Sequence, residues 1–420
     1  MATGAGLSIG SSRHCGALFL IHDLRPGGAE RVYLDYLRGM KRIRPIPVLV
    51  RPHGGLAAEI TDGFPIYHLE KGGTRALRRR ERSWSDSGQD HDVRDSLLGG
   101  GASLLMKARR LTRIARAESA SIVSTFLHKS HAVALVAKLA LDGNLRVVVN
   151  VHEHPTQHLE THFSRSRRRL MRGYYRWLLP RADRIVAVSR GIRDDLVERF
   201  NISDALIDVT RNPIDVETLR FKARAEIPSA DLPAGAGPLV VGVGRLEWIK
   251  GFDLLVEALG AVRRTVPARL ALVGDGTARA DLEALAASLG LDGCVSFPGY
   301  RENPMPYMAA ADLLVLPSRT EAWPNVIGEA MAIGTPVLAA RCSPGVEEFL
   351  GCGRYGTLVE PHDPRSLAEG IADVLSRPER LSELSRLGRE RASEFDHTTV
   401  IAHYESVLEL VMSGRGGVGP

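Results

Sequence analysis

Residues 313–340 read LLVLPSRTEAWPNVIGEAMAIGTPVLAA and contain a complete strand–helix–strand unit. Both ends are short, continuous apolar runs, which are typical of parallel strands buried on both faces. Pro324 cannot lie deep inside a helix, so the helix begins near it and Glu321 lies on the preceding loop. Glu329 then falls in the first turns of the helix. The unit therefore predicts a parallel sheet covered by helices.

The same alternation of apolar runs and amphipathic stretches continues along the chain. Five runs in the first half predict buried strands: Ala17–Ile21, Pro47–Val50, Ile122–Phe126, Arg146–Val151 and Arg184–Val188. A second series predicts five more: Leu239–Val243, Leu270–Val273, Val295–Phe297, Leu313–Leu316 and Pro336–Ala340. Two such series predict an α/β protein with two Rossmann-like, doubly wound parallel-sheet domains.

Length and composition suggest where the domains divide. The 420 residues exceed what one hydrophobic core usually covers. The segment 228–238 is rich in Pro, Ala and Gly, which is typical of a linker. We expect a first domain at 1–228, a second at 237–395, and a C-terminal helix and tail at 396–420 that pack back on the first domain. Residues 72–101 show no clear period and predict a mobile surface insert.

The overall composition narrows the class of protein. An apolar share of 44% and a charged share of 25% argue against a disordered or fibrous chain. No stretch approaches the ~20 apolar residues of a membrane-spanning helix, and the run at 15–21 is interpreted as a first strand, not a signal peptide. The four cysteines show no paired spacing. Neither a disulfide framework nor a zinc ribbon is indicated, and a cytoplasmic location is expected.

Charge is distributed unevenly between the two halves. The net charge is +13 up to residue 236 and −7 beyond it, within a total of +6. The basic surplus gathers at 75–82, 107–116 and 165–176. Such clusters suit an anionic membrane surface or a phosphorylated acceptor, and solvated helix faces are the alternative interpretation. We expect the protein to associate peripherally with the inner face of the plasma membrane, and we expect no nucleic-acid partner.

The strand predicted at 239–243 leads into a candidate diphosphate clamp. The glycine at its end, Gly244, lets the backbone turn close to a ligand, and Arg245 and Lys250 follow as two nearby cations. A helix that begins near Gly251 presents its N-terminal N–H groups at the same edge. A surface turn with two solvated cations would look similar.

The unit that opens this section supplies two carboxylates beside the same edge. Ligands bind to open α/β sheets beyond the carboxyl ends of the strands. Glu321 and Glu329 would both face that crevice, where carboxylates suit hydrogen bonding to sugar hydroxyls. The N–H groups near Asn325 and Val326, at the start of the helix, can accept a phosphate. A favourable helix N-terminal charge is the alternative for Glu329.

The first domain offers weaker signals. Gly27 and Gly28 precede a predicted helix and favour close approach of a phosphate or a sugar. His152 and His154 follow the strand predicted at 146–151, where histidines donate hydrogen bonds or shuttle protons. His158 and His162 come next at helical spacing. With no evident carboxylate as third ligand, we interpret them as a solvated helix face and predict no metal.

Cofactor motifs are incomplete. Two G-x-G fragments, at 242–244 and 274–276, lack the third glycine of the dinucleotide-binding fingerprint. The sequence also contains neither a P-loop nor a Gly-x-Ser-x-Gly elbow. We therefore expect no nicotinamide, flavin or other cofactor.

Seven segments, taken in order, carry a family resemblance: GGAER at 27–31, VVNVHE at 148–153, ADRIVAVS at 182–189, RNPID at 211–215, GRLEWIKG at 244–251, LVGDG at 272–276 and SRTEAWPNVIGEAMAIGTPVLA at 318–339. The chain resembles the retaining glycosyltransferase family 4, whose members have two Rossmann-like domains facing a central cleft, the GT-B arrangement. The C-terminal half is the specific part of this resemblance. One departure is Trp323-Pro324, where Phe-Gly often follows the first glutamate in the family.

The resemblance implies roles for the C-terminal residues. Arg245 and Lys250 would hold the donor diphosphate, and Gly244 would let the backbone approach it. Glu329 would bind the nucleotide ribose, and Glu321 would face hydroxyls of the donor sugar. Backbone N–H groups of the turn that ends with Asn325 and Val326 would lie near sugar and phosphate.

On the first-domain side, the family's histidine would fall on His152, near the outer hydroxyls of the transferred sugar, with His154 as a rival. Gly27, Gly28 and Glu30 would shape this side of the donor site. The residues expected to act in catalysis are therefore His152 together with the loop groups Glu321, Arg245 and Lys250.

As a function, the resemblance implies metal-independent transfer from a nucleotide-sugar, with a UDP-sugar favoured, to a glycan or lipid-linked acceptor in polysaccharide or lipopolysaccharide synthesis. The anomeric configuration would be retained through attack on the face from which the diphosphate departs. The alternatives are a soluble natural-product acceptor, a sugar-nucleotide 2-epimerase of the same architecture, and a non-catalytic subunit.

Overall fold

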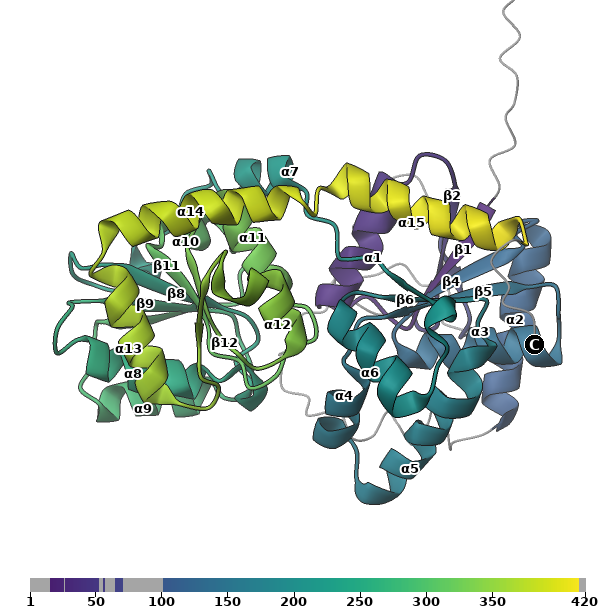
Figure 1. The fold of residues 1–420 in the computed structure, drawn as a ribbon, viewed down its shortest axis with the longest axis horizontal. Helices are drawn as coiled ribbons and strands as arrows, with labels where there is room; N and C mark the ends of the chain where they lie inside the picture. Colours follow the sequence, from purple (N-terminus) through teal and green to yellow (C-terminus); the bar gives the residue numbers. More distant parts are fainter. Residues whose placement is uncertain (1–15, 26, 53–55, 57–64, 71–100, 415–420) are drawn as a thin grey trace, which may run out of the picture.

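The fold, known from a computed structural model, contains two parallel sheets side by side, each covered by helices (Figure 1). The structure describes residues 16–25, 27–52, 56, 65–70 and 101–414. The segment expected to form a mobile insert, 72–101, lies outside these residues except for its last position. The predicted α/β class with two doubly wound sheets is confirmed.

In the first sheet the described strands follow the order β3-β2-β1-β4-β5-β6-β7, the arrangement of a Rossmann-like domain. Their bounds are β1 (Gly16–Ile21), β2 (Arg44–Leu49), β3 (Tyr67–His68), β4 (Ile122–Phe126), β5 (Arg146–Val151), β6 (Arg184–Ala187) and β7 (Ile207–Val209). The helices are α1 (Gly28–Gly39), α2 (Gly101–Ala117), α3 (His128–Ala140), α4 (Pro155–His162), α5 (Arg165–Gly173) and α6 (Arg190–Phe200). A π-helical turn (Tyr174–Leu178) follows α5.

In the second sheet the described strands follow the order β10-β9-β8-β11-β12-β13, again with parallel pairing. Their bounds are β8 (Leu239–Val243), β9 (Arg269–Val273), β10 (Val295–Gly299), β11 (Leu313–Leu316), β12 (Val337–Ala340) and β13 (Thr357–Val359). The helices in this half of the chain are α7 (Val216–Lys222), α8 (Phe252–Val262), α9 (Arg279–Ser288), α10 (Met305–Ala310), α11 (Asn325–Ile333), α12 (Pro344–Phe349), α13 (Pro364–Leu375) and α14 (Pro378–Ser393), followed by α15 (His397–Met412), which returns to the first domain.

The chain enters the second domain before the composition suggests. Ile214 pairs with Phe395 and His397 through backbone hydrogen bonds of 2.9 and 3.1 Å. The two crossing segments, in which the chain passes from one domain to the other, therefore lie side by side. The helix α7 then packs on the second domain, where Arg220 Nε donates to the carbonyl of Ala332. Residues 216–222, which lie within the expected first domain of 1–228, therefore contact the second domain.

The segment 228–238, expected to be a linker, is docked on the second domain. Asp231 Oδ2 lies 2.7 Å from Arg301 Nη2 and also contacts Tyr307, and Ser296 Oγ donates to the Asp231 carbonyl at 2.8 Å. Polar side chains of the second domain thus hold a stretch whose composition alone resembles a flexible connection.

The last helix, α15, lies along the first domain (Figure 1). Tyr404 stacks on Tyr36 of α1 at 4.2 Å between ring centroids, and its hydroxyl lies 2.5 Å from Ser124 Oγ. The carboxylate of Glu405 accepts backbone N–H bonds from the loop after α1, including one of 3.0 Å from Ile43. The second half of the chain therefore completes the core of the first.

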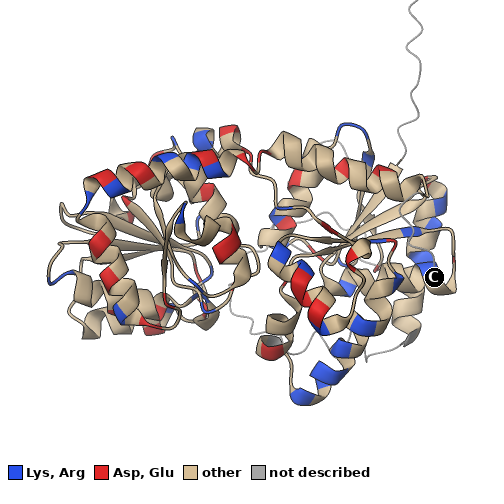
Figure 2. Cartoon of the chain, in the orientation of Figure 1, with Lys and Arg blue, Asp and Glu red and all other residues tan. Residues whose placement is uncertain are grey.

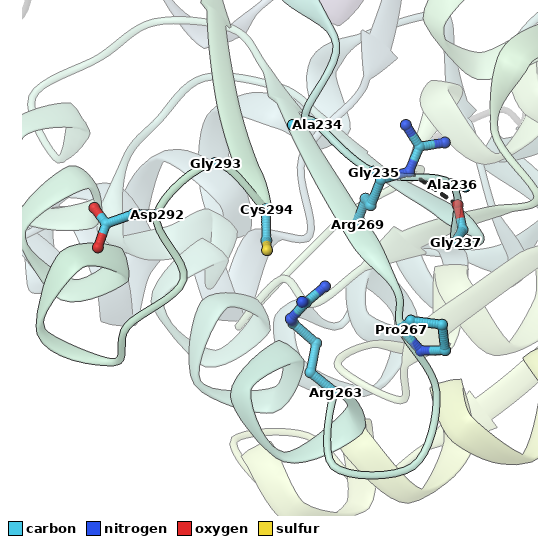
Figure 3. Close-up of a pocket in the computed structure, with 10 residues that line it drawn as sticks. All are labelled: Ala234, Gly235, Ala236, Gly237, Arg263, Pro267, Arg269, Asp292, Gly293 and Cys294. Atoms are coloured by element: carbon cyan, nitrogen blue, oxygen red, sulfur yellow. Dashed lines mark hydrogen bonds between the residues drawn. The ribbon is translucent and has the colours of Figure 1, made fainter.

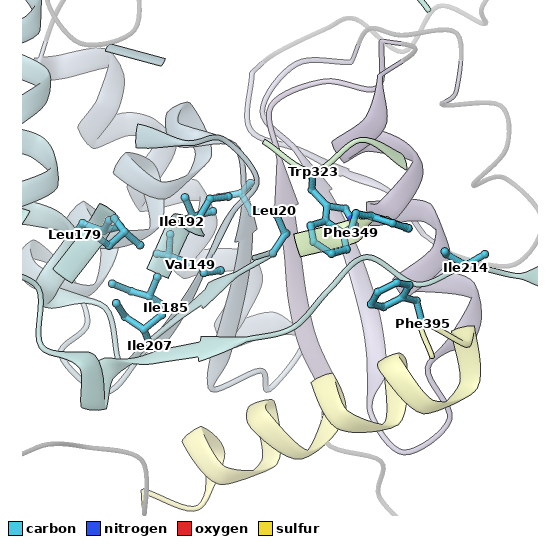
Figure 4. Close-up of a cluster of buried hydrophobic side chains, with 14 of the residues drawn as sticks. Leu20, Val149, Leu179, Ile185, Ile192, Ile207, Ile214, Trp323, Phe349 and Phe395 are labelled. Carbon is cyan, nitrogen blue, oxygen red and sulfur yellow. The ribbon is translucent and has the colours of Figure 1, made fainter. Parts of the chain in front are cut away.

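An aromatic cluster lies close to the crossing between the domains (Figure 4). The Trp323 ring packs against Phe349 and Phe395, with centroid distances of 4.6 and 5.6 Å. All three side chains are buried, and Ile214 from the first crossing segment belongs to the same core. The residue that departs from the family pattern, Trp323, is thus a core residue that anchors the loop carrying Glu321.

Candidate functional site

The carboxyl edges of the two sheets meet, and direct contacts join them. Asn325 Nδ2, at the start of α11, donates to the Gly28 carbonyl at 3.4 Å. Thr320 Oγ1 in the loop after β11 donates to Gln157 Oε1 of α4 at 2.6 Å. We call the residues at these facing edges the interdomain site. Most of the residues expected in the active site, from both halves of the chain, lie here.

Lys250 and Glu321 form the centre of the second-domain side. Lys250 Nζ lies 2.7 Å from Glu321 Oε1, and the buried Ser318 hydroxyl donates to the same oxygen at 2.7 Å. Both side chains of the ion pair are mostly buried. The pair is therefore fixed in position, with its ammonium group available for further hydrogen bonds.

Arg245 is the more exposed cation. Its side chain is 48% exposed and its Nη1 lies 2.6 Å from Glu247 Oε1, a pair of the kind that contributes little to stability. The guanidinium can therefore turn from Glu247 to an anionic ligand at small cost. Together with Lys250 it provides two positive charges on one loop.

Glycines allow this loop to pack tightly. Gly251 has φ +66°, and a Cβ there would lie 2.2 Å from the Pro317 carbonyl oxygen. At Gly274, φ is +150° and a Cβ would lie 1.8 Å from the Gly244 carbonyl oxygen. Larger residues would separate the loop after β8 from its neighbours. Gly274, in one of the two G-x-G fragments, therefore serves loop packing.

Glu329 on α11 faces the first domain. Its Oε1 lies 3.7 Å from Arg31 Nη1 of α1. After the hydrogen bond from Asn325 to Gly28, this is a second contact that α11 makes with the first domain. Burial raises the pKa of Glu329, and Arg31 acts in the opposite direction. Arg31 was not singled out from the sequence, although it stands in the quoted GGAER segment, one turn after Gly27.

The first turn of α1 brings a second carboxylate to the site. Burial raises the pKa of Glu30 to about 7, and Arg25 and Arg245 act in the opposite direction. Because the charge of Arg245 lowers the pKa of Glu30, the Glu30 carboxyl group faces the cations of the second domain. A Cβ on Gly27 would lie 2.3 Å from Glu30 Oε2, so the carboxyl group folds back over the start of the helix. Gly27 thus makes room for Glu30.

The structure separates the two candidate histidines. His152 stacks on Phe126 at 5.6 Å, and burial lowers its pKa to about 4, with Glu153 acting in the opposite direction. His154 Nδ1 instead lies 3.5 Å from Asp195 Oδ2 of α6, which also accepts from the Thr156 backbone N–H at 2.9 Å. His154 thus faces Asp195 at the start of α4, whereas His152 lies against Phe126. His152 Nε2 and His154 Nδ1 are both buried without a hydrogen bond among the described residues.

The interpretation of His158 as part of a solvated helix face is wrong. Its side chain is 14% exposed and its Nδ1 lies 2.9 Å from Glu153 Oε2. His128, at the start of α3, lies on the other side of the same carboxylate. Burial opposes ionisation of Glu153, but these two imidazoles hold its pKa well below the usual range. A carboxylate thus accompanies the histidines, contributed by the end of β5 and not by helical spacing.

The helix α5 of the first domain carries a basic face, and much of its ribbon is blue in Figure 2. Arg165, Arg169 and Arg172 are exposed along it, and Trp177 in the following π-helical turn is 71% exposed. Among the described residues, no helix combines the length and the apolar character that crossing a bilayer requires.

A surface pocket in the second domain lies away from the interdomain site (Figure 3). Its lining residues precede or begin β8, β9 and β10, at the amino edge of the sheet: Ala234, Gly235, Ala236, Gly237, Arg263, Pro267, Arg269, Asp292, Gly293 and Cys294. The residues expected to bind donor all lie at the opposite, carboxyl edge. This pocket therefore does not belong to the site.

Two doubly wound domains whose carboxyl edges meet over paired cations and glutamates define a glycosyltransferase of the GT-B type. The model of Glycosyltransferase Family 4 matches residues 26–218, and the model of Glycosyl transferases group 1 matches residues 237–377. Between them they match most of the chain, which belongs to glycosyltransferase family 4.

Relatives agree with this assignment. The chain is 27% identical to an N-acetylgalactosaminyltransferase of Campylobacter jejuni named for a diphospho-undecaprenol acceptor, over 66% of this chain and 72% of the relative. It is 35% identical to LpsE of Rhizobium meliloti, a lipopolysaccharide core glycosyltransferase, over 42% of this chain and about half (51%) of that protein. Its fold is similar to that of Anabaena HepE in complex with UDP and glucose, with a TM-score of 0.73 at 21% identity, over 94% of this chain and 100% of HepE.

Proposed function

We propose that this glycosyltransferase moves a sugar from a UDP-sugar to a lipid-linked or glycan acceptor, with retention of the anomeric configuration. The observation that carries the proposal is the exposed cation Arg245 on the same loop as Lys250, which Glu321 fixes in position at 2.7 Å. UDP is favoured because HepE, a protein of similar fold, binds UDP and glucose.

The donor diphosphate would lie between these cations and the start of α11. Asn325 and Val326 are its first residues, and among the described residues no side chain caps this end. Free N–H groups at a helix start favour an anion. Two cations and a helix N-terminus would neutralise the charge that develops on the departing diphosphate. Gly244 and Gly28 would allow the donor to approach the two backbones closely.

The glutamates would bind the rest of the donor. Lys250 and Ser318 both reach Oε1 of Glu321, so Oε2 is the oxygen that would accept a hydroxyl of the sugar. Glu329 would accept a ribose hydroxyl. His152 would contact the outer sugar hydroxyls as a neutral imidazole, because its pKa of about 4 keeps it uncharged at physiological pH. We prefer His152 to His154, which faces Asp195.

In the reaction, the acceptor hydroxyl would attack the anomeric carbon on the face that the diphosphate leaves. The bond from this carbon to the acceptor oxygen forms as the bond to the phosphate oxygen breaks. The hydroxyl proton passes to the departing diphosphate. Attack on the same face retains the configuration without a protein nucleophile.

The basic face of α5 supports an acceptor held at an anionic membrane. Arginines near such a surface contribute about 1 kcal/mol each, and an exposed Trp is suited to the interface. We propose that α5 and Trp177 contact the cytoplasmic leaflet. The Arg169→Glu/Arg172→Glu variant would lose sedimentation with anionic vesicles, whereas Arg264→Glu/Arg365→Glu on the second domain would keep it. Equal sedimentation of both variants would contradict this surface.

The donor site is tested by calorimetry of the full chain with UDP, GDP and ADP in EDTA. Selective binding of UDP is expected, with its loss in Lys250→Ala and its retention in Lys41→Ala, a matched change at an exposed lysine far from the site. No binding of any nucleotide would overturn the proposal. Products from UDP-glucose then separate two activities, since a transferase releases UDP and a 2-epimerase yields a second UDP-sugar.

A further inference from the structure

Three metal-ligating side chains gather on the first-domain side, where no part of the donor clamp lies. His128 begins α3 after β4, Glu153 follows β5, and His158 lies one turn into α4. One nitrogen from each histidine and one carboxylate oxygen lie within 4.8 Å of one another. The histidine rings are 5.4 Å apart and tilted by 48°, so they are not stacked in parallel. We call these residues the His128–Glu153–His158 cluster.

Two of the atoms that face one another in this cluster are unsatisfied in the part of the chain that the structure describes. His128 Nδ1 and Glu153 Oε2 are buried and have no hydrogen bond among the described residues. His158 Nδ1 lies 2.9 Å from Glu153 Oε2, within ion-pair distance. His128 Nδ1 is 3.9 Å from Oε1, beyond hydrogen-bond reach. Buried polar atoms without a hydrogen-bond partner are rare in folded proteins.

The geometry points to a divalent transition-metal site of the zinc class, held by the His128–Glu153–His158 cluster. Two imidazoles and one carboxylate form a recognised zinc ligand set, which leaves a fourth position open. With metal–ligand bonds of about 2.1 Å, the ligands of a tetrahedral site lie about 3.4 Å apart. The distances between ligand atoms in the cluster, 2.9 and 3.9 Å for the two histidine–glutamate pairs, lie on either side of this value. Small side-chain rotations would therefore bring all three ligand atoms onto one ion.

The open position would be accessible from the interdomain site. The Glu153 side chain is 30% exposed, so the cluster is accessible to solvent. Gln157, the residue before His158, accepts from Thr320, which precedes Glu321. The ion would therefore lie on the acceptor side of the donor loop, where its fourth ligand would be water or a phosphoryl or hydroxyl oxygen of the acceptor. This role is separate from diphosphate neutralisation by Arg245 and Lys250.

The test uses untagged full-length protein and Co²⁺, whose absorption bands report coordination by nitrogen and oxygen. One Co²⁺ per chain is expected, displaced by Zn²⁺. His128→Ala, His158→Ala and Glu153→Gln should each weaken binding at least about 100-fold, since even the loss of an outer partner costs 10- to 100-fold. His403→Ala, at an exposed histidine of α15, is the matched control and should bind Co²⁺ as the wild type does.

Folding of the variants is checked separately by UDP binding in EDTA, which does not depend on this ion. No Co²⁺ binding by a wild type that binds UDP would overturn the metal site and leave the donor site intact. Co²⁺ binding that survives in all three variants would also overturn it. Loss of UDP binding with intact Co²⁺ binding would instead contradict the proposed function alone.

Discussion

Glu30 gives donor binding a defined dependence on pH. Its pKa of about 7 means that the native carboxyl group is mostly protonated at pH 5.5 and mostly ionised at pH 8.5. A bound diphosphate would draw Arg245 away from Glu30 and would place negative charge beside the Glu30 carboxyl group. Ionisation of Glu30 should then oppose binding, so affinity falls as pH rises through 7.

The size of this effect follows from the charges. Two unit charges about 8 Å apart interact by about 2 kcal/mol at an effective dielectric constant of 20, and salt reduces this value. A loss of about 1–2 kcal/mol corresponds to a 5- to 30-fold weaker affinity at pH 8.5 than at pH 5.5. UDP-glucose is the suitable ligand, because its diphosphate lacks the terminal phosphate group that titrates near pH 6.

The assay is calorimetric titration at several pH values, with Glu30→Gln as the matched variant. The neutral amide keeps the shape of the side chain and cannot ionise, so its affinity should stay near the wild-type value at pH 5.5 throughout the range. If wild type and variant lose affinity in parallel, the charge of Glu30 is not the cause and the reasoning fails.

Three further changes test the packing and electrostatics of the fold. Trp323→Ala removes a buried ring from the cluster with Phe349 and should lower the free energy of unfolding by about 3–5 kcal/mol in urea titrations; an unchanged midpoint would contradict its core role. Tyr404→Phe removes the hydroxyl that bonds Ser124 and should cost about 1 kcal/mol in the same assay, whereas an unaltered value would show that the bond contributes nothing. Burial raises the pKa of Asp35 to about 7, so the native state binds more protons than the unfolded state between about pH 3.8 and 7, and stability falls as pH rises across this window. Asp35→Asn should therefore raise the melting temperature at pH 8 and leave it unchanged at pH 3; an equal change at both values would exclude the titration of Asp35 as the cause.

Local chemistry made the donor side of the site predictable. Apolar runs mark the buried strands, and Pro324 separates a loop glutamate from a helical one, so the positions of Glu321 and Glu329 follow from residues close in sequence. The ion pair of Glu321 with Lys250 did not follow, because it joins the ends of two strands that are neighbours only in the folded sheet. The contact of Arg31 with Glu329 depends on how two domains meet.

Two features that composition and spacing did not reveal have a common physical origin. Residues 228–238 have the composition of a linker, and only the pairing of Asp231 with Arg301 shows that they are docked. His158 has the spacing of a helix face, and only the arrival of Glu153 and His128 from two strand ends shows that it is enclosed. Composition and periodicity describe what a segment can do alone, whereas both outcomes depend on distant partners.

The same dependence on distant partners explains why the site needs both domains. Polar contacts join its two sides at Thr320 with Gln157 and at Asn325 with Gly28, and contacts of this kind allow domains to move. The pairing of Ile214 with Phe395 ties the chain at the crossing, and α15 returns to complete the first core. A donor that touches both edges would add contacts between them. Donor binding should therefore stabilise the arrangement of the domains that brings His152 toward Glu321.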